Sequence, residues 1–149
     1  MKKILFYILI TVFIGSIPSF FLNISDKYKS LNKPPFSPPG FLFPIVWTIL
    51  FVLMGISIYK IVKTGSQNTK EAKLIYFIQL IVNALWTPIF FGLDEYFLAF
   101  LWILMLILLV ITMLIIFSKI DKISVYLNIP YLLWLLFACY LTFGTFILN

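Results

Sequence analysis

The sequence contains no histidine and a single cysteine, Cys139. These two absences exclude disulfide bonds within the chain, zinc sites built from cysteine and histidine, haem held by histidine, and serine–histidine catalytic triads. We therefore expect no metal or other cofactor, and any chemistry has to proceed without an imidazole. Cys139 is expected to be inert packing.

Charge is scarce as well, because only 11% of the 149 residues are charged while 63% are apolar and the mean hydropathy is +1.12. This composition excludes an ordinary soluble domain and indicates an integral membrane protein. The net charge of +6 lies in short connections between apolar blocks. Its expected role is orientation in the membrane, and no nucleic-acid partner is predicted.

Five apolar blocks are long enough to cross a bilayer, since about 20 residues at 1.5 Å each span its hydrocarbon core. Lys2 and Lys3 precede the first block as in a signal peptide, but the small-residue cleavage pattern is missing, so a retained helix is predicted. The fold class is therefore all-α, a bundle of five transmembrane helices in a single domain, residues 1–149. The predicted spans are residues 4–22, 44–62, 74–91, 96–117 and 125–148.

Residues 33–47 hold five of the eight prolines and interrupt the apolar pattern. Each proline removes an N–H donor and fixes φ near −65°, and irregular backbone cannot lie exposed to lipid. We expect residues 23–43 to be a stiff connection that covers the bundle at the membrane surface. Pro44 suits the first turn of the second helix, where its missing N–H costs nothing.

Proline and glycine also occur inside the predicted spans. Gly15 and Pro18 should soften the first helix toward its outer end. Pro88 and Pro130 predict kinks in the third and fifth helices, and such kinks can also open space between helices; both interpretations remain open. The uniformly apolar residues 96–117 are expected to make the most lipid contact.

The distribution of lysine predicts the orientation. Eight lysines lie on the N-terminal side of the predicted bundle and three on the opposite side. Positive residues favour the cytoplasmic side, so we expect a multi-pass protein of the cell membrane with a cytoplasmic N-terminus and an outward C-terminus. The eight are Lys2, Lys3, Lys60, Lys63, Lys70, Lys73, Lys119 and Lys122, and the three are Lys27, Lys29 and Lys33.

The predicted spans contain no Asp, Glu, Lys or Arg away from their ends. Pumps, ion-coupled transporters and channels with charged filters usually carry such groups inside the membrane, so these classes are disfavoured. No inverted repeat is visible, and the G-x-x-x-G dimerisation pattern is absent, which leaves a homodimer open.

Aromatic and mildly polar residues recur along one face of each of three spans, at spacings close to i, i+3, i+4 and i+7. Three such faces could line one pocket. Alternatively, tryptophans near span ends form interfacial belts, which suits Trp47 and Trp86 better than Trp134. Asn83 must lie inside the bundle, either in an interhelical hydrogen bond or against a ligand. The faces are Trp47, Thr48 and Phe51; Asn83, Trp86, Thr87 and Phe90; and Tyr131, Trp134, Ala138 and Thr142.

Four segments of the sequence resemble, in order, motifs of the translocator protein family, also called the tryptophan-rich sensory proteins or TspO/MBR, and a bacterial member in particular. They are Lys33-Pro34-Pro35-Phe36-Ser37-Pro38-Pro39-Gly40, Pro44-Ile45-Val46-Trp47-Thr48, Asn83-Ala84-Leu85-Trp86-Thr87-Pro88-Ile89-Phe90-Phe91 and Pro130-Tyr131-Leu132-Leu133-Trp134-Leu135-Leu136-Phe137-Ala138. The resemblance covers the first connection and parts of three spans.

The resemblance implies a cavity under the first loop that binds flat hydrophobic ligands, a tetrapyrrole such as protoporphyrin above all, in a regulatory or stress-sensing role. Trp47, Asn83 and Trp134 fall on pocket positions of the family, Ala138 on a small ligand-contacting position and Tyr28 on a loop residue near the cavity. With the neighbouring residues of the three faces, the expected ligand-binding set is Tyr28, Trp47, Phe51, Asn83, Trp86, Phe90, Tyr131, Trp134 and Ala138.

Two alternative functions follow from the same resemblance. One is light-dependent porphyrin degradation with Trp47 and Trp134 as the catalytic residues, because an indole can act as a redox partner for a photoexcited ring. The other is facilitated porphyrin transport, which is weaker because no coupling group is present. The sequence also departs from the family, with Phe41 where a tryptophan often follows Pro-Pro-Gly and with no basic residue after Lys122 to complete a cholesterol motif.

Overall fold

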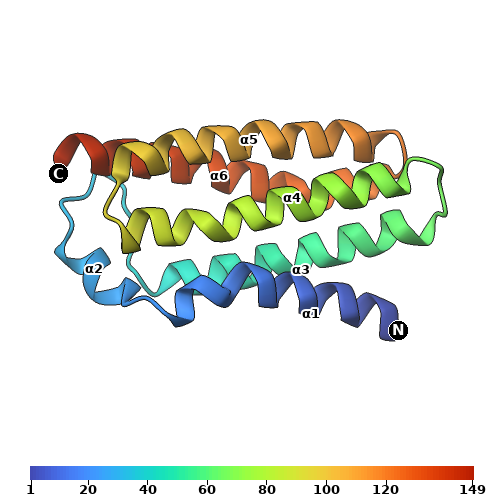
Figure 1. Cartoon of the computed structure of the whole chain (residues 1–149), viewed down its shortest axis with the longest axis horizontal. Coiled ribbons are helices and arrows are strands. Elements are labelled where there is room, and N and C mark those ends of the chain that lie inside the picture. Colours follow the sequence, from blue (N-terminus) through green and yellow to red (C-terminus); the bar gives the residue numbers. More distant parts are fainter.

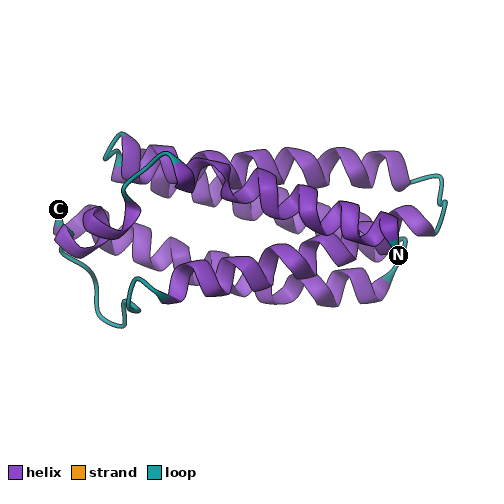
Figure 2. Cartoon of the chain, turned by 90° about the horizontal axis from the view of Figure 1, so that it is seen from below, coloured by secondary structure: helices purple, strands orange, loops and turns teal.

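The computed structural model describes all 149 residues and contains helices only (Figure 1). Five helices are long and apolar enough to cross a membrane, as predicted. They run up and down in one bundle, and the two chain ends lie at opposite ends of it (Figures 1 and 2). The elements are α1 (Lys2–Ser16), η1 (Ile17–Phe20), α2 (Ile24–Ser30), α3 (Leu42–Lys63), α4 (Thr69–Thr87), η2 (Pro88–Gly92), α5 (Tyr96–Ser118) and α6 (Lys122–Leu148).

The first span ends in two pieces. Helix α1 stops at Ser16, and a tighter 3₁₀ turn, η1, carries Pro18 in its first turn. A proline fits there because the first N–H groups of a helix have no partner within it. The softening expected around Gly15 and Pro18 is therefore confirmed.

The predicted connection, residues 23–43, contains a short helix that hydropathy did not indicate. Helix α2 has Asp26 in its first turn and Lys27 and Lys29 in its last turn. These charges complement the helix dipole, with the acid at the positive end and the bases at the negative end. Only residues 31–41 form an irregular segment, which we call the proline loop.

Several helices extend beyond the apolar blocks by a polar turn. Helix α4 begins at Thr69 rather than at residue 74, and α6 begins at Lys122 rather than at residue 125. At α6 the cause is local, because the Asp121 side chain accepts a hydrogen bond of 2.9 Å from the Ser124 backbone N–H. Such an N-cap can start a helix at the membrane surface, where hydropathy gives no signal.

The two internal prolines act differently. Pro88 begins the π-helical turn η2, in which the Leu93 N–H bonds the Pro88 carbonyl at 2.9 Å. Pro130 lies inside the continuous helix α6 and is exposed on its surface. Both positions are consistent with the expected local distortions, because a proline N cannot bond the carbonyl four residues earlier.

Helix packing contradicts one expectation about lipid contact. In α1 only Thr11 is buried, whereas eight residues of α5 are buried. Helix α1 therefore makes the most lipid contact, although α5 has the higher mean hydropathy. The reason is that α5 packs extensively against both α4 and α6, whereas α1 packs mainly against α3. The Trp102 indole of α5 also donates to the Val82 carbonyl of α4 at 2.8 Å.

Helix α1 approaches α3 closely, most of all where their backbones meet. A Cβ atom added at Gly55 would lie 2.6 Å from the Ile8 Cα atom, so the two backbones are in direct contact. The Thr11 hydroxyl adds a hydrogen bond to the Tyr76 hydroxyl of α4, at 2.5 Å. Small residues at such contacts are typical of helix pairs in membranes.

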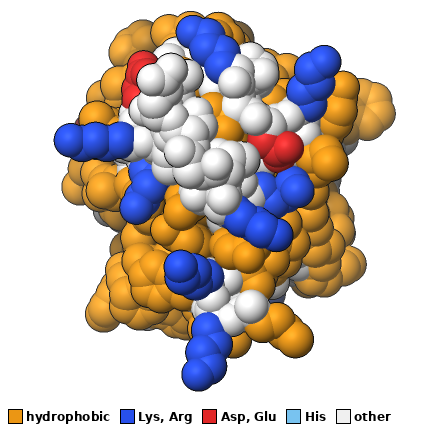
Figure 3. All heavy atoms as spheres, turned by 90° about the vertical axis from the view of Figure 1, so that its right-hand side faces the viewer, with side chains coloured by type: hydrophobic (Ala, Val, Ile, Leu, Met, Phe, Trp, Pro, Cys, Tyr) orange, Lys and Arg blue, Asp and Glu red, His pale blue; other side chains and the backbone are white.

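Charge is unequally distributed between the two ends of the bundle. The end with the N-terminus carries eight lysines and two acids, Glu71 and Asp121. Figure 3 views this end, where blue lysine side chains surround the exposed turns. The opposite end has three lysines and three acids, so the whole net charge of +6 lies at the N-terminal end.

Candidate functional site

A cluster of three buried polar side chains links α6 to α4 in the middle of the bundle. The Tyr131 hydroxyl donates to the Gln79 side-chain carbonyl at 2.7 Å and accepts from the Asn83 amide at 2.8 Å. All three side chains are buried. Asn83 therefore lies inside the bundle, as both alternatives required, and the structure shows the interhelical hydrogen bond, one of the two. Gln79 was not predicted, although an amide within a span is the same signal that singled out Asn83.

Trp47 of α3 stands against this polar cluster, with Phe51 beside it. Trp47 meets Tyr131 edge to face at 6.2 Å between ring centroids, and it lies 5.4 Å from Phe51. Phe51 is buried and Trp47 is half-buried. Trp47 therefore faces α6, whereas the Phe51 ring lies against α1, where a Cβ atom added at Gly15 would clash with its Cζ atom. Thr48 is exposed and bonds only the Pro44 carbonyl.

Trp134 connects this interior to the proline loop. Its ring lies 5.9 Å from Phe43, which in turn lies 5.1 Å from Tyr28 of α2. The Tyr28 hydroxyl donates to the Pro38 carbonyl, and burial raises the pKa of this phenol, so it remains a donor at neutral pH. The sequence predicted Tyr28 and Trp134 but missed Phe43, the ring that joins them.

Trp86 and Phe90 form a second aromatic group beside the first. Their rings stack at 4.7 Å with an interplanar angle of 19°, and Phe90 also lies 4.9 Å from Tyr96. Trp86 packs against both the main core and the smaller core around Phe90 and Phe91, so it joins the two groups. Ala138, on α6, packs half-buried against the main core. We refer to the nine predicted residues as the aromatic site.

The proline loop is seated directly on α6. Pro34 is buried, and a Cβ atom added at Gly144 would lie 2.5 Å from the Pro34 Cβ atom. The Tyr140 hydroxyl donates to the Pro35 carbonyl at 2.7 Å. At the chain end, the Asn149 amide donates to the Asn32 carbonyl at 2.8 Å. The loop therefore covers the end of the bundle at which the C-terminus lies, and the expected cover over the bundle is present.

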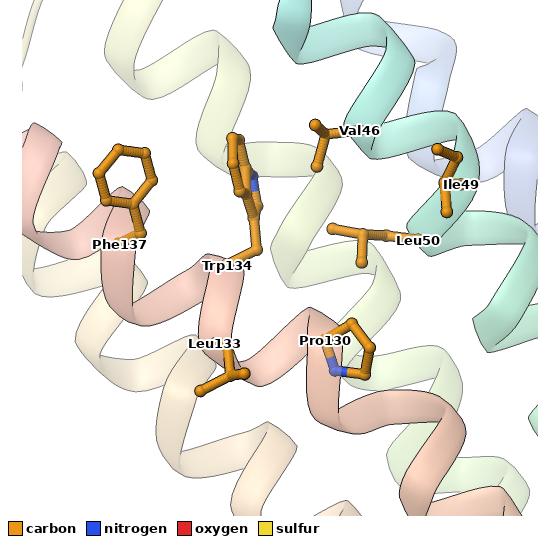
Figure 4. Close-up of a pocket in the computed structure, with 7 residues that line it drawn as sticks. All are labelled: Val46, Ile49, Leu50, Pro130, Leu133, Trp134 and Phe137. Carbon is orange, nitrogen blue, oxygen red and sulfur yellow. The ribbon is translucent and has the colours of Figure 1, made fainter. Parts of the chain in front are cut away.

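A groove of about 430 Å³ opens between α3 and α6 at the depth of Trp134 (Figure 4). Pro130 lies on its wall, which places the proline beside an opening between helices. In Figure 4 the Trp134 ring stands between Phe137 of α6 and Val46 of α3. The lining residues are Val46, Ile49, Leu50, Pro130, Leu133, Trp134 and Phe137.

Three buried hydrogen-bond donors around the aromatic site have no acceptor in the protein. They are the indole nitrogens of Trp86 and Trp134 and the side-chain amide nitrogen of Gln79. Buried polar groups are nearly always satisfied, and leaving one unpaired costs about 1–3 kcal/mol. A ligand with hydrogen-bond acceptors could satisfy donors of this kind, so the site suits an apolar molecule that carries a few acceptors.

A second polar cluster, nearer the N-terminal end, was missed from the sequence. The Asn128 amide donates to the Ser57 hydroxyl of α3 at 2.8 Å, and the Ser124 hydroxyl donates to the Ser57 carbonyl at 3.1 Å. All three residues are buried, so the cluster ties α3 to α6. Asn128 carried the same signal as Asn83, an amide within a predicted span, whereas Ser57 and Ser124 carry no individual signal and are revealed only by their pairing across the bundle.

Comparison with known proteins identifies the family. The TspO/MBR family profile matches residues 7–148. The chain is 36% identical over 149 residues to the tryptophan-rich protein TspO of Archaeoglobus fulgidus, covering 99% of this chain and 97% of that protein. It is 37% identical over 124 residues to the protein of the same name from Chlorobaculum tepidum, covering 82% and 78%.

An animal protein is also similar. The translocator protein of Ovis aries is 33% identical over 119 residues, which cover 78% of this chain and 70% of that protein. The match to the family profile extends from α1 to the last turn of α6, so it includes every residue of the aromatic site. The chain is a multi-pass membrane protein that belongs to the TspO/MBR family.

Proposed function

We propose that this protein binds a tetrapyrrole such as protoporphyrin, and other flat hydrophobic ligands, at the aromatic site, in a regulatory or stress-sensing role. The observation that carries the proposal is the pair of buried indole nitrogens of Trp86 and Trp134, which have no acceptor in an otherwise apolar, aromatic surrounding. Aromatic rings stack on a flat ligand, and indole N–H groups bond its acceptors. The family resemblance supports the ligand class.

The groove between α3 and α6 supports access to the site. Trp134 lines the groove, and its ring also contacts Phe43, which in turn contacts Tyr28. A hydrophobic ligand dissolved in the bilayer would meet Trp134 first, without crossing the polar end of the bundle. Because the groove already opens between α3 and α6, binding then requires side chains at the groove to rearrange but no separation of the two helices.

The proposal is tested by tryptophan fluorescence of the purified protein in detergent. Protoporphyrin should quench this fluorescence beyond a blank of free tryptophan amide in the same detergent. Trp134→Phe should weaken binding about fivefold, the effect of losing about 1 kcal/mol of stacking and hydrogen bonding. Trp102→Phe is the matched control, because Trp102 ties α5 to α4 outside the site. No quenching above the blank would reject the function.

A second function, light-dependent degradation of the bound porphyrin, rests on the same Trp134. Its indole nitrogen is buried and unpaired, and its half-buried ring packs against Phe43 beside the groove, so it lies where it could exchange an electron with a photoexcited ring. Illumination in the presence of oxygen should then bleach the Soret band more slowly in Trp47→Phe and Trp134→Phe than in wild type. Equal rates at equal occupancy would leave binding alone.

For the orientation, we propose that the N-terminal end faces the cytoplasm and the C-terminus faces outward across the cell membrane. Support comes from the charges, because the whole net charge of +6 lies at the N-terminal end. A phosphatase that folds only outside the cytoplasm should be active when fused after Asn149 and inactive when inserted at Ser66, in the turn between α3 and α4. The reverse pattern would contradict this orientation.

A further inference from the structure

We propose that Lys33 binds the carboxylate edge of the ligand and so fixes the direction in which a tetrapyrrole lies in the aromatic site. This inference rests on the proposed function and adds a specificity-determining residue to it. It starts from the fact that protoporphyrin is not uniformly apolar, because ionisable carboxylate arms extend from one edge of its ring.

Those carboxylates cannot lie deep in the bundle. The spans carry no charged residue away from their ends, and an unpaired ionised carboxylate in an apolar interior is very costly. The ring must therefore bind with its carboxylate edge toward an end of the bundle where a cation is available. The aromatic site lies toward the outer end, under the proline loop, so the choice is among three lysines there.

Of these three, Lys33 has the most suitable surroundings. Lys27 is paired with Asp94 at 2.8 Å, and Lys29 is exposed. Lys33 is half-buried, and its ammonium group lies 4.7 Å from the centroid of the Tyr28 ring. It donates to the Tyr28 carbonyl at 2.9 Å and to the Leu31 carbonyl at 3.2 Å. An ammonium group has three N–H donors, so one remains for a ligand.

The position of Lys33 also fits the site geometrically. Its ammonium group lies over Tyr28, Tyr28 contacts Phe43, and Phe43 contacts Trp134. These three successive contacts lead from the cation to an indole nitrogen that lacks an acceptor. A macrocycle lying against Trp134 and Phe43 can bridge this span with a carboxylate arm. The partly buried setting strengthens the pairing relative to one on an exposed surface.

The remaining charges at this end do not provide an alternative partner. The three lysines are balanced by Asp26, Asp94 and Glu95, so the outer end attracts anions only where a lysine is locally unopposed. No acid forms an ion pair with Lys33 within 4.0 Å, since the pair Lys27–Asp94 is the only salt bridge in the protein. A carboxylate that arrives at Lys33 therefore displaces no existing ion pair.

The test compares protoporphyrin with its dimethyl ester, which has the same ring and no charge. We expect the wild-type protein in a neutral detergent to bind the diacid about fivefold more tightly than the ester, corresponding to about 1 kcal/mol for a half-buried ion pair. Lys33→Gln should bind both forms equally, with its affinity for the ester unchanged. Lys33→Arg, which keeps the charge, should retain most of the preference.

Lys29→Gln is the matched control, because it removes the same charge from the same end of the bundle at an exposed position. It should keep the preference for the diacid. The inference is overturned if Lys33→Gln keeps the preference or if Lys29→Gln loses it equally. If Lys33→Gln binds both the diacid and the ester as tightly as the wild type does, the inference is overturned and the proposed function stays intact, whereas no binding of either form would overturn both.

Discussion

Gly144 provides a direct test of how the proline loop is held, because it faces the buried Pro34 across a very short distance. A methyl group at Gly144 would approach the Pro34 Cβ and Cγ atoms to 2.5 and 2.6 Å. Carbon atoms in contact prefer about 3.5–4.0 Å, so the loop must move by about 1 Å in Gly144→Ala. Overpacking of this kind costs about 1–3 kcal/mol.

The same substitution also has a favourable effect that must be separated from the clash. Alanine is better than glycine in a helix interior by about 1 kcal/mol. We therefore expect a net loss of about 1 kcal/mol, which lowers the melting temperature by about 2–4 °C in a chain of this size. Gly92→Ala is the matched control, since its new Cβ atom would meet only Leu22 at an ordinary 3.5 Å, and it should not lower the melting temperature.

Thermal unfolding of the detergent-solubilised protein measures both variants. Adding Pro34→Gly to Gly144→Ala removes the ring and the Cβ atom that clash, so the two substitutions should be less destabilising together than the sum of each alone. Because the shifted loop also strains the Tyr140–Pro35 hydrogen bond, ligand association should become faster in Gly144→Ala. An unchanged melting temperature together with strict additivity would refute the direct seating of Pro34 on α6.

Three further predictions follow from the packing and the caps. Gly55→Ala should detach α1 from α3, because its Cβ atom would lie 2.6 Å from the Ile8 backbone, and limited proteolysis should then cut α1 earlier than in wild type. Tyr131→Phe removes two interhelical hydrogen bonds of about 0.6 kcal/mol each and should lower the free energy of unfolding by about 1–2 kcal/mol, measured by SDS-induced unfolding. Tyr126→Phe, at an exposed site, is the control and should leave the free energy of unfolding unchanged. The hydrogen bond from the Ser124 hydroxyl lowers the pKa of Asp121, so the ionised N-cap stabilises α6 at neutral pH. This stabilisation should be lost as the pH falls below about 4 and the carboxylate is protonated. Melting temperatures measured against pH should show the loss in the wild type and not in Asp121→Asn.

The number and order of the spans could be predicted from the sequence because a bilayer demands long apolar helices. Their ends could not, since polar turns such as the one capped by Asp121 lie at the membrane surface and obey capping rules instead of hydropathy. Helix α2 was missed for a related reason, because five of its seven residues are polar or charged and its composition therefore resembles that of a loop. Lipid exposure of α1 also escaped prediction, because hydropathy measures solubility in lipid and says nothing about which helices have partners.

The candidate site was predictable where one residue carries the signal alone. Asn83 was placed inside the bundle because an amide within a span needs a partner, and helical spacing placed Trp47 on an inner face of α3, where it meets Tyr131, the partner of Asn83. Phe43 and the seating of Pro34 were not predictable, because a phenylalanine among seventeen and a proline among eight carry no individual signal. Their roles depend on contacts between distant segments, which only the folded chain defines.

The contact between Asn149 and Asn32 has a consequence for measuring loop motion. The last turn of a helix normally frays, and its amide hydrogens then exchange quickly with solvent. Here the Asn149 side chain bonds both the Asn32 carbonyl and the Thr145 carbonyl, each at 2.8 Å, so the end of α6 is secured by the loop itself. Hydrogen exchange at the final turn of α6 should therefore report each opening of the loop, and it does so without any label placed in the loop.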